Sequence, residues 1–400
     1  MKKYRKLKSN ALLQKIVQKD YLKSRVLHRL GPSAWVTSGF PVEILRAMGI
    51  SPFYPENYGA LCAARKASAR LCQEAEDRGY SRELCAYGRN HLGSLYNPSR
   101  APLKGLPRPD LLLACNNICG TVLKWYQTLS RELQVPLFFL DTPYRSGGDN
   151  GEGAVSYVEK QLHTLVEFLE GRTGRKLNED RLLETLELSA EATRLWAKVR
   201  DMGKHRPSPI NAPDLFVNMA PIVVLRGTKQ AADYYRVLLA ELEGRVAAGE
   251  GALLRENFRL LWDNIAIWHR VLSFYSMFTE YGACFVVDTY TGAWSGTWDA
   301  GEDPYRSMAR VYTRIMLNQG IESRAAAMLK DAKDYGVDGF VMHANRSCKP
   351  YSQLQLPLRR VLTENTGLPG LLVEADMCDP RNYAAESIKT RVEAFLENLA

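Results

Sequence analysis

Short apolar runs alternate with helix-like segments in the first part of the chain. Residues 33–56, SAWVTSGFPVEILRAMGISPFYPE, have the pattern of a strand, a loop, a helix and a second strand. Residues 109–144 add the apolar run in PDLLLACNNIC, the helix-like segment KWYQTLSREL and the apolar run in VPLFFLDTPY. Short apolar runs bounded by turn residues are typical of buried strands. The pattern predicts about four strands joined by helices.

The same alternation returns near the C-terminus. Residues 259–290 hold the apolar runs RLLWDNIAI and GACFVVDTY, and we expect a helix from about 268 to 280 between them. Residues 336–380 hold GVDGFVMHANRSC and LPGLLVEADMCDP, separated by a helical segment that ends near residue 365. Strands that alternate with helices form parallel sheets. A second set of about four parallel strands is therefore expected here.

Polar residues recur at matching places in the two parts and indicate an internal repeat. In each part an Asp precedes a strand, an Asn and a Cys follow it, and another Asp ends the next strand: Asp110, Asn117, Cys119 and Asp141 in the first, and Asp338, Asn345, Cys348 and Asp376 in the second. Convergent loop chemistry could mimic this match. The pattern still favours an α/β protein with two related Rossmann- or flavodoxin-like domains, each built on a short parallel sheet.

The middle of the chain has a helical pattern. Residues 155–205 and 228–250 are rich in Leu, Glu, Ala and Arg at helical spacing, and Asn178 or Asp180 would cap a long amphipathic helix. The segment RPSPINAP at 206–213 is expected as a loop. We therefore predict an N-terminal basic helical segment that packs on the helical domain, a first α/β domain, a helical insert and a second α/β domain, at residues 1–30, 31–154, 155–255 and 256–400.

Composition and charge narrow the setting. A chain of 400 residues exceeds one compact core, and 46% hydrophobic with 24% charged residues is ordinary for a globular protein. No apolar run reaches the roughly 18 residues that span a membrane. The net charge of +9 lies largely in the first 30 residues, which lack the apolar core of a targeting segment. Without a nucleic-acid-binding motif, this charge favours phosphorylated small molecules such as coenzyme A, or acidic partners, in the cytoplasm.

The cysteines raise the question of a metal site. A cytosolic chain rarely uses cysteines as a disulfide framework, and most are small buried hydrophobic residues. Ligands of open parallel sheets bind beyond the carboxyl ends of the strands. Cys119 and Cys348 follow such ends, one in each predicted domain, and Cys85 falls between the second and third strands of the first. Three cysteines facing one interdomain cleft could hold a metal or cluster, although each alone is better explained by packing.

Several segments run in order over nearly the whole chain: SGFPVEILRAMGISPFYPEN, LCAYGRNHLG, CNNICGTVLKWYQ, LDTPY, NRSCKPYS and EADMCDPRNY. Together they resemble the 2-hydroxyacyl-CoA dehydratase and benzoyl-CoA reductase family, specifically its core subunits, of which the 2-hydroxyglutaryl-CoA dehydratase D-component is an example. The resemblance concerns the paired core subunits and not the ATP-hydrolysing activator.

The resemblance implies a cluster site. Family core subunits hold one iron–sulfur cluster by three cysteines, which correspond here to Cys85, Cys119 and Cys348. Cys119 is preferred over Cys115 because the family's second cysteine lies five residues before the Lys that opens the next helix, here Lys124. Soft thiolates suit a [4Fe–4S] cluster, and three ligands leave one iron open. A double-cubane 8Fe–9S cluster is the alternative.

Two more residues match the family's active-site segments. Ser38, at the end of the first strand, would hydrogen-bond an oxygen on the open iron, and Glu56, at the end of the second, would serve as acid or base. Read without the resemblance, Ser38 is a helix N-cap and Glu56 a solvated turn residue.

The resemblance also implies partners and a reaction. A separate ATP-dependent iron–sulfur activator would deliver a low-potential electron, and a homologous second core subunit would complete the enzyme. The substrate would be an acyl-CoA or aromatic-CoA thioester, either dehydrated through a ketyl radical or reduced in its aromatic ring. The sequence leaves this choice open. It also leaves open a non-catalytic electron-transfer subunit, with a double-cubane cluster in a homodimer, and a metal-free binding protein.

Other residues have simpler interpretations. We expect His343 to be a core histidine, and Asp141 and Asp376 to cap loops or contact neighbouring helices. The stretch GGDNGEG at 147–153 lacks the Lys-Ser/Thr of a P-loop and is expected as a flexible loop near the site. The tryptophans expected in the core or at a partner interface are Trp262, Trp268, Trp294 and Trp298.

Overall fold

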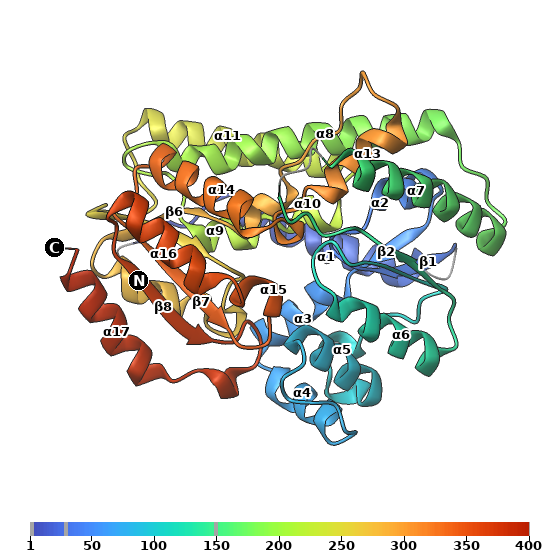
Figure 1. Cartoon of the computed structure of the whole chain (residues 1–400), viewed down its shortest axis with the longest axis horizontal. Helices are drawn as coiled ribbons and strands as arrows, with labels where there is room; N and C mark the ends of the chain where they lie inside the picture. Colours follow the sequence, from blue (N-terminus) through green and yellow to red (C-terminus); the bar gives the residue numbers. More distant parts are fainter. Residues whose placement is uncertain (1–3, 28–30, 148–150, 400) are drawn as a thin grey trace.

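The chain forms two separate four-stranded parallel sheets, covered by helices. The computed structural model describes residues 4–27, 31–147 and 151–399. Its strand order is β2-β1-β3-β4 in the first sheet and β6-β5-β7-β8 in the second. The first half lies at the right of Figure 1 and the second half at the left. The predicted α/β class with two short parallel sheets is confirmed.

The first sheet carries the N-terminal part of the site. Its strands are β1 (Ser33–Val36), β2 (Ser51–Phe53), β3 (Leu111–Cys115) and β4 (Leu137–Leu140). Its helices are α2 (Val42–Ala47), α3 (Pro55–Ala64), α4 (Ser68–Glu76), α5 (Ala86–Tyr96) and α6 (Thr121–Leu133). Strands β1 and β3 are buried along their whole length, which explains their uninterrupted apolar sequences.

The second sheet repeats this plan. Its strands are β5 (Phe258–Asp263), β6 (Ala283–Asp288), β7 (Gly339–Asn345) and β8 (Gly370–Ala375). Its helices are α12 (Ser273–Thr279), α14 (Ile321–Asp334), α15 (Lys349–Ser352), α16 (Gln355–Thr366) and α17 (Ala385–Glu397). The helix expected from about 268 to 280 is divided into a 3-10 turn, Trp268–Arg270, and α12.

The two halves use the same polar contact at the start of the sheet. The Asp110 carboxylate accepts the backbone N–H of Ser33 at 2.8 Å, and Ser33 begins β1. The Asp338 carboxylate accepts the backbone N–H of Arg259 at 2.7 Å, near the start of β5. These matched contacts support the internal repeat that the sequence suggested.

Helices between the two halves join them. They are α7 (Glu152–Thr173), α8 (Glu179–Asp201), α9 (Ala212–Asn218), α10 (Ala220–Val224), α11 (Lys229–Ala247) and, within the second half, α13 (Pro304–Thr313). Helices α8 and α11 run along the top of Figure 1. Asn178, one of the two candidate caps, accepts the Arg181 N–H at the start of α8. One buried hydrophobic cluster extends from the first sheet through these helices to α13. Because this cluster continues across the expected boundary between residues 154 and 155, the domain boundaries expected from the sequence stay a prediction.

The N-terminal segment lies against this helical region. The Tyr4 hydroxyl donates to Asp214 of α9, and the backbone N–H groups of Lys8 and Ser9 donate to the Glu241 carboxylate of α11. Helix α1 (Asn10–Leu27) follows. Its Asn10 side chain accepts a hydrogen bond from Asn218.

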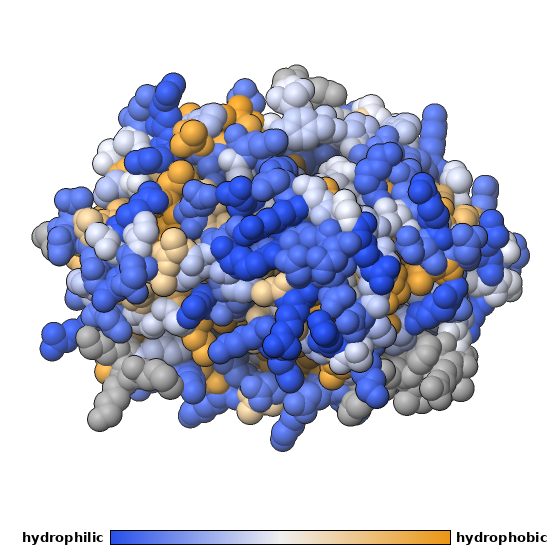
Figure 2. All heavy atoms as spheres, turned by 90° about the horizontal axis from the view of Figure 1, so that it is seen from below, coloured by the Kyte–Doolittle hydropathy of each residue, from blue (hydrophilic) through white to orange (hydrophobic). Residues whose placement is uncertain are grey.

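The surface seen in Figure 2 is largely hydrophilic, and hydrophobic residues form small patches between the polar side chains. Within the described part of the chain, no helix combines the length and the apolar character needed to cross a membrane.

Candidate active site

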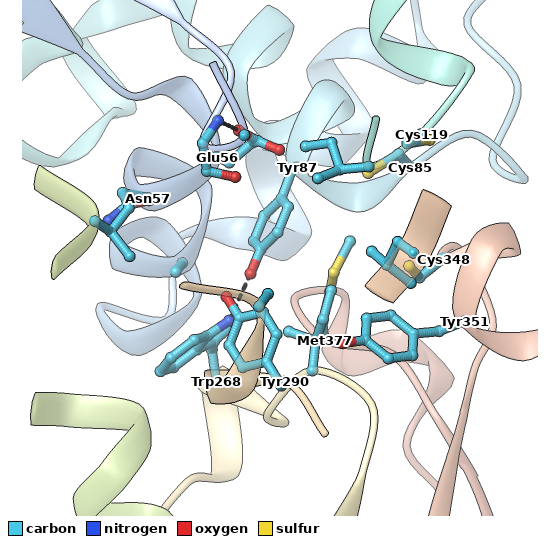
Figure 3. Close-up of a pocket in the computed structure, with 18 of the residues that line it drawn as sticks. Glu56, Asn57, Cys85, Tyr87, Cys119, Trp268, Tyr290, Cys348, Tyr351 and Met377 are labelled. Carbon is cyan, nitrogen blue, oxygen red and sulfur yellow. Dashed lines mark hydrogen bonds between the residues drawn. The ribbon is translucent and has the colours of Figure 1, made fainter. Parts of the chain in front are cut away.

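A cavity of about 290 Å³ lies where the strand ends of the two sheets face each other (Figure 3). Its wall includes the residues that follow the strands of both sheets and residues from α9 and α10. All five residues that the sequence singled out for the site line this one cavity: Ser38, Glu56, Cys85, Cys119 and Cys348.

Two of the thiols sit on equivalent turns with the pattern Asn-x-x-Cys. The backbone N–H of Cys119 donates to the Asn116 carbonyl at 3.1 Å, and that of Cys348 donates to the Asn345 carbonyl at the same distance. Each turn directly follows the inner strand of its sheet, β3 or β7. Such a turn projects its cysteine beyond the carboxyl end of the sheet, where ligands of parallel sheets bind.

The asparagine side chains fix these turns to the neighbouring strand. The side-chain Oδ1 of Asn116 accepts the Thr142 N–H at 2.6 Å, and the side-chain Oδ1 of Asn345 accepts the Met377 N–H at 3.3 Å. Thr142 and Met377 each lie two residues beyond the end of their strand. The sequence comparison paired Asn117 with Asn345, whereas the structure gives the equivalent role to Asn116.

All three cysteines stand at the beginning of a helix. Cys85 directly precedes α5, Cys348 directly precedes α15, and Cys119 lies two residues before α6. The Thr121 N–H donates to the Cys119 sulfur at 3.2 Å. Free N–H groups at a helix start favour a negatively charged sulfur and tune a metal bound to it.

A hydrogen bond connects the cysteine turns of the two halves. The backbone N–H of Ala86, next to Cys85, donates to the hydroxyl of Ser347 at 3.1 Å, next to Cys348. Both groups are buried. The positions of these two thiols are therefore coupled across the interface between the halves.

Burial favours the protonated form of the three thiols as long as no metal is bound to them. Burial and, as a smaller effect, the neighbouring Cys119 together raise the pKa of Cys85 to about 12. The pKa of Cys348 is also raised, first by burial and then by Cys85 and Cys119. No lysine, arginine or histidine is among the described residues that line the cavity. A cationic metal centre is what would convert these thiols to thiolates.

The donor set consists of three soft thiols, the ligand type of iron–sulfur clusters. Among the described residues, no group of three or more His, Cys, Asp or Glu side chains is close enough together to hold a metal ion. The remaining cysteines are buried and lie outside the cavity wall: Cys62, Cys72, Cys115, Cys284 and Cys378. Cys115 instead contacts the Thr142 hydroxyl at 3.2 Å.

Glu56 is a buried carboxyl in the first turn of α3. It accepts the backbone N–H of Ser38, and both residues are 9% exposed. Burial raises the pKa of Glu56 to about 7, against the lowering effect of Ser38. A carboxyl with such a pKa can exist in either protonation state near neutral pH, as acid–base catalysis requires.

The loop that carries Ser38 is fixed on several sides. Its Gly39 carbonyl accepts from the Asn117 side chain at 3.0 Å, and its Phe40 carbonyl accepts from Arg226 at 3.0 Å. A Cβ at Gly39 would lie 2.4 Å from the Asn117 side-chain oxygen. This close approach requires glycine and links the Ser38 loop to the turn that ends at Cys119.

The other residues noted in the sequence have structural contacts. His343 is buried, and its Nδ1 lies 2.8 Å from the Ile265 carbonyl. Asp141 contacts Tyr157 of α7, and Asp376 accepts backbone N–H groups after β8. Trp262 is fully buried, and Trp268 and Trp294 line the cavity. The stretch 147–153 lies partly outside the described residues.

Sequence reasoning missed an aromatic part of the cavity wall. The Trp268 indole N–H donates to the Tyr87 hydroxyl at 2.6 Å, and Tyr290 lies beside them (Figure 3). Phe216 and Met219 reach the same wall from the helical region. Tyr290 lies two residues after the end of β6, so the strand-end rule could have indicated it, but no local pattern indicated Phe216 or Met219.

The fold and the site together define an α/β protein with a thiol-lined cavity between two related halves. The family model for the 2-hydroxyglutaryl-CoA dehydratase D-component matches residues 37–399. The chain therefore belongs to this family of 2-hydroxyacyl-CoA dehydratase and benzoyl-CoA reductase subunits, and is a component of an enzyme.

Three relatives show the range of the family. The chain is 33% identical to the (R)-2-hydroxyisocaproyl-CoA dehydratase alpha subunit of Clostridioides difficile, over 92% of this chain and 90% of the relative. It is 31% identical to the (R)-phenyllactyl-CoA dehydratase alpha subunit of Clostridium sporogenes, over 91% and 88%. Identity to a benzoyl-CoA reductase subunit of Thauera aromatica is 30%, over 89% and 85%.

Proposed function

We propose that the chain is the iron–sulfur core subunit of a 2-hydroxyacyl-CoA dehydratase or benzoyl-CoA reductase. The observation that supports this most is the convergence of three thiols on the cavity that also holds Ser38 and Glu56. Cys85, Cys119 and Cys348 would hold a [4Fe–4S] cluster with one iron free of protein ligands. When bound, the cluster would supply one-electron transfer at low potential to a CoA thioester in the cavity.

The chain's own residues would bind the thioester and move protons. Glu56, with a pKa of about 7, would give a proton to a substrate atom or take one from it. The Ser38 hydroxyl would donate a hydrogen bond to a substrate oxygen. The apolar wall would exclude water, which strengthens both interactions.

A second hollow offers room for the polar part of coenzyme A. It shares Gly39, Ala293 and Trp294 with the cavity, and its lining includes Arg314. Arginine suits phosphate groups because its guanidinium presents several donors in a plane. The net charge of +9 also favours a phosphorylated ligand.

We further propose two protein partners, a homologous second core subunit and an ATP-dependent iron–sulfur activator. The relatives' designation as subunits of their enzymes supports the first. Because both partners would be needed, the isolated chain should show no turnover until both are added.

All eight cysteines are free thiols, as expected in a reducing, cytoplasmic compartment.

Serine substitution tests the ligand set. We expect Cys85→Ser, Cys119→Ser and Cys348→Ser each to lose iron and the absorbance near 400 nm, since a serine hydroxyl is a poor ligand for iron in a cluster. The measurement is iron and sulfide per anaerobically purified chain: about four irons for a single cluster, about eight for a double cubane.

Cys115→Ser is the matched control. Cys115 lies four residues before Cys119 on the same strand-to-turn segment, but it contacts Thr142 and does not line the cavity. This variant should keep its iron. Loss of iron in Cys115→Ser with retention in Cys119→Ser would reverse the assignment, and a colourless, iron-free wild-type protein would contradict the proposed function.

A further inference from the structure

The described lining of the cavity beside the three cysteines is largely apolar and includes no cationic side chain. Most of its lining side chains are aliphatic or aromatic, among them Met219, Val223, Ile265 and Ile315. Glu56 is the only acidic side chain among the described lining residues, and none of these is Lys, Arg or His. A ligand carboxylate in this space would therefore find no partner of opposite charge.

One side of the cavity is a wall of aromatic rings. The ring centroids of Phe216 and Trp268 are 6.4 Å apart, those of Phe216 and Tyr290 6.3 Å, and those of Tyr290 and Trp294 5.7 Å. Figure 3 shows Trp268 and Tyr290 on the side away from Cys119. Rings at such separations make edge contacts, and an additional ring or a branched alkyl group can pack against them.

The indole N–H groups of Trp268 and Trp294 in this wall already have protein partners. The Trp268 indole donates to the Tyr87 hydroxyl at 2.6 Å, and the Trp294 indole donates to the Ser38 carbonyl at 3.3 Å. Neither indole is left as a donor for a ligand carboxylate. The wall therefore contributes packing surface more than charge recognition.

The energetics of burial favour an uncharged ligand. Removing apolar surface from water is favourable, whereas an unpaired ionised carboxylate is strongly disfavoured in an apolar site. Glu56 shows that the cavity itself opposes a negative charge, because burial raises its pKa to about 7. A second carboxylate nearby would also be repelled by ionised Glu56.

We infer that this cavity takes an uncharged, bulky apolar acyl group, branched aliphatic or aromatic, and rejects acyl groups that end in a second carboxylate. The inference rests on the proposed function, because it concerns the acyl end of the proposed CoA thioester. The relatives are named for different acyl groups, and the inference selects one class of acyl group for this chain.

Binding of unreactive thioesters tests the inference without any electron transfer. The ligands are isocaproyl-CoA, phenylpropanoyl-CoA, glutaryl-CoA, the methyl ester of glutaryl-CoA and free CoA, and none carries the hydroxyl that dehydration needs. Dissociation constants are measured by calorimetry on the anaerobically purified full chain. We expect the two apolar thioesters to bind about tenfold to a hundredfold more tightly than glutaryl-CoA. The methyl ester should regain most of this difference because only the charge is removed.

The outcomes separate the inference from the proposed function. Glutaryl-CoA binding as tightly as isocaproyl-CoA would overturn the inference and leave the proposed function intact. Thioesters that bind no better than CoA would also overturn it, since the acyl group would then occupy no cavity. No binding of CoA or any thioester would contradict the proposed function itself.

A cationic side chain added to the cavity wall tests whether the acyl group binds there. Val217 lines the cavity and is 41% exposed, so Val217→Arg adds a cation with little effect on folding. We expect the affinity of glutaryl-CoA relative to isocaproyl-CoA to rise by about tenfold. The matched control is Val237→Arg on α11, which is 46% exposed and outside the cavity, and it should leave the ratio unchanged. An unchanged ratio in Val217→Arg would contradict this placement of the acyl group.

Discussion

The two α/β halves share a scaffold but contribute different chemistry to the cavity. Both have the same strand order and an Asn-x-x-Cys turn after the inner strand. The first half places Ser38 after β1 and Glu56 after β2. At the corresponding strand ends, the second half places Ile265 after β5 and Tyr290 after β6.

This difference shows how a repeated scaffold can serve one asymmetric site. The strand ends determine where side chains meet, because carboxyl ends of parallel strands lie along one edge. The loops that follow them determine which groups meet there. In this molecule the first half supplies the polar and ionisable groups together with two of the thiols, and the second half supplies one thiol and much of the apolar wall.

A buried arginine joins each half to the helical region. Arg226, between α10 and α11, forms an ion pair with Glu43 of α2 at 3.0 Å and donates to the Phe40 carbonyl. Arg259, on β5, forms an ion pair with Glu256 and donates to the Gly203 carbonyl at 2.6 Å. Only the first of these arginines contacts the loop of the candidate site.

Removal of these arginines should give the largest effects. Arg226→Met and Arg259→Met should each lower the free energy of unfolding by about 3–5 kcal/mol, because the buried Glu43 carboxylate and the half-buried Glu256 carboxylate lose their cationic partners. Only Arg226→Met should also weaken thioester binding, since Arg226 holds the Phe40 carbonyl of the loop that carries Ser38. Denaturant unfolding and calorimetric binding measure the two effects.

A double variant shows whether the cost comes from the unpaired charge. Glu43→Gln in the Arg226→Met background removes the carboxylate, and we expect it to recover part of the lost stability. Equal weakening of thioester binding in Arg226→Met and Arg259→Met would remove the functional distinction between the two halves.

Each half also contains a buried histidine that sets the acid sensitivity. His91 on α5 packs against Trp35, with ring centroids 4.5 Å apart, and burial lowers its pKa to about 3. Burial lowers the pKa of His343 on β7 to about 4. Because both values lie below the unfolded pKa, the unfolded chain binds more protons as pH falls below about 6.5. Each histidine should therefore destabilise the fold by about 2 kcal/mol at pH 5.

Phenylalanine variants isolate the two contributions. The loss of stability between about pH 7 and pH 5 should shrink by about 2 kcal/mol in His91→Phe and by a similar amount in His343→Phe. His343→Phe also loses the contact with the Ile265 carbonyl, which changes stability at every pH, so the pH difference is the quantity to compare. If the loss of stability between about pH 7 and pH 5 is the same in a variant as in the wild type, the replaced histidine does not contribute to acid sensitivity.

Much of this comparison could be predicted from the sequence, and part of it could not. The apolar runs indicated both sheets because strands buried on both faces need uninterrupted apolar residues. The segments around Cys85, Cys119 and Cys348 indicated residues that the structure brings to one cavity. Phe216 and Arg226 gave no signal, because each acts through contacts with residues distant in the chain. The pairing of Asn116 with Asn345 was open to sequence reasoning through the shared Asn-x-x-Cys spacing, but the sequence comparison paired Asn117 with Asn345 instead, and the hydrogen bonds correct this.

The smallest expected effect concerns the aspartates at the opposite ends of the strands. The Asp110 carboxylate accepts both the backbone N–H and the hydroxyl of Ser33, at 2.8 and 2.9 Å, whereas Asp338 accepts the Arg259 N–H. A buried hydrogen bond to a charged group is worth about 1.5–3 kcal/mol. Asp110 and Asp338 are exposed, so each of their hydrogen bonds should be worth less. Asp110→Ala should therefore cost about 1–2 kcal/mol of unfolding free energy and Asp338→Ala about 1 kcal/mol. Asparagine at either position keeps an acceptor and should restore part of this loss.

Thioester binding should be unchanged in all four aspartate variants, because these contacts lie at the strand starts and the cavity lies at the strand ends. Denaturant unfolding and calorimetry check both expectations on the same preparations. A larger cost for Asp338→Ala than for Asp110→Ala would show that the two halves differ at their base as well as at the site. Weakened thioester binding in either variant would show that the strand starts influence the loops at the other end of the sheet. The shared scaffold would then not be separable from the loops that it carries.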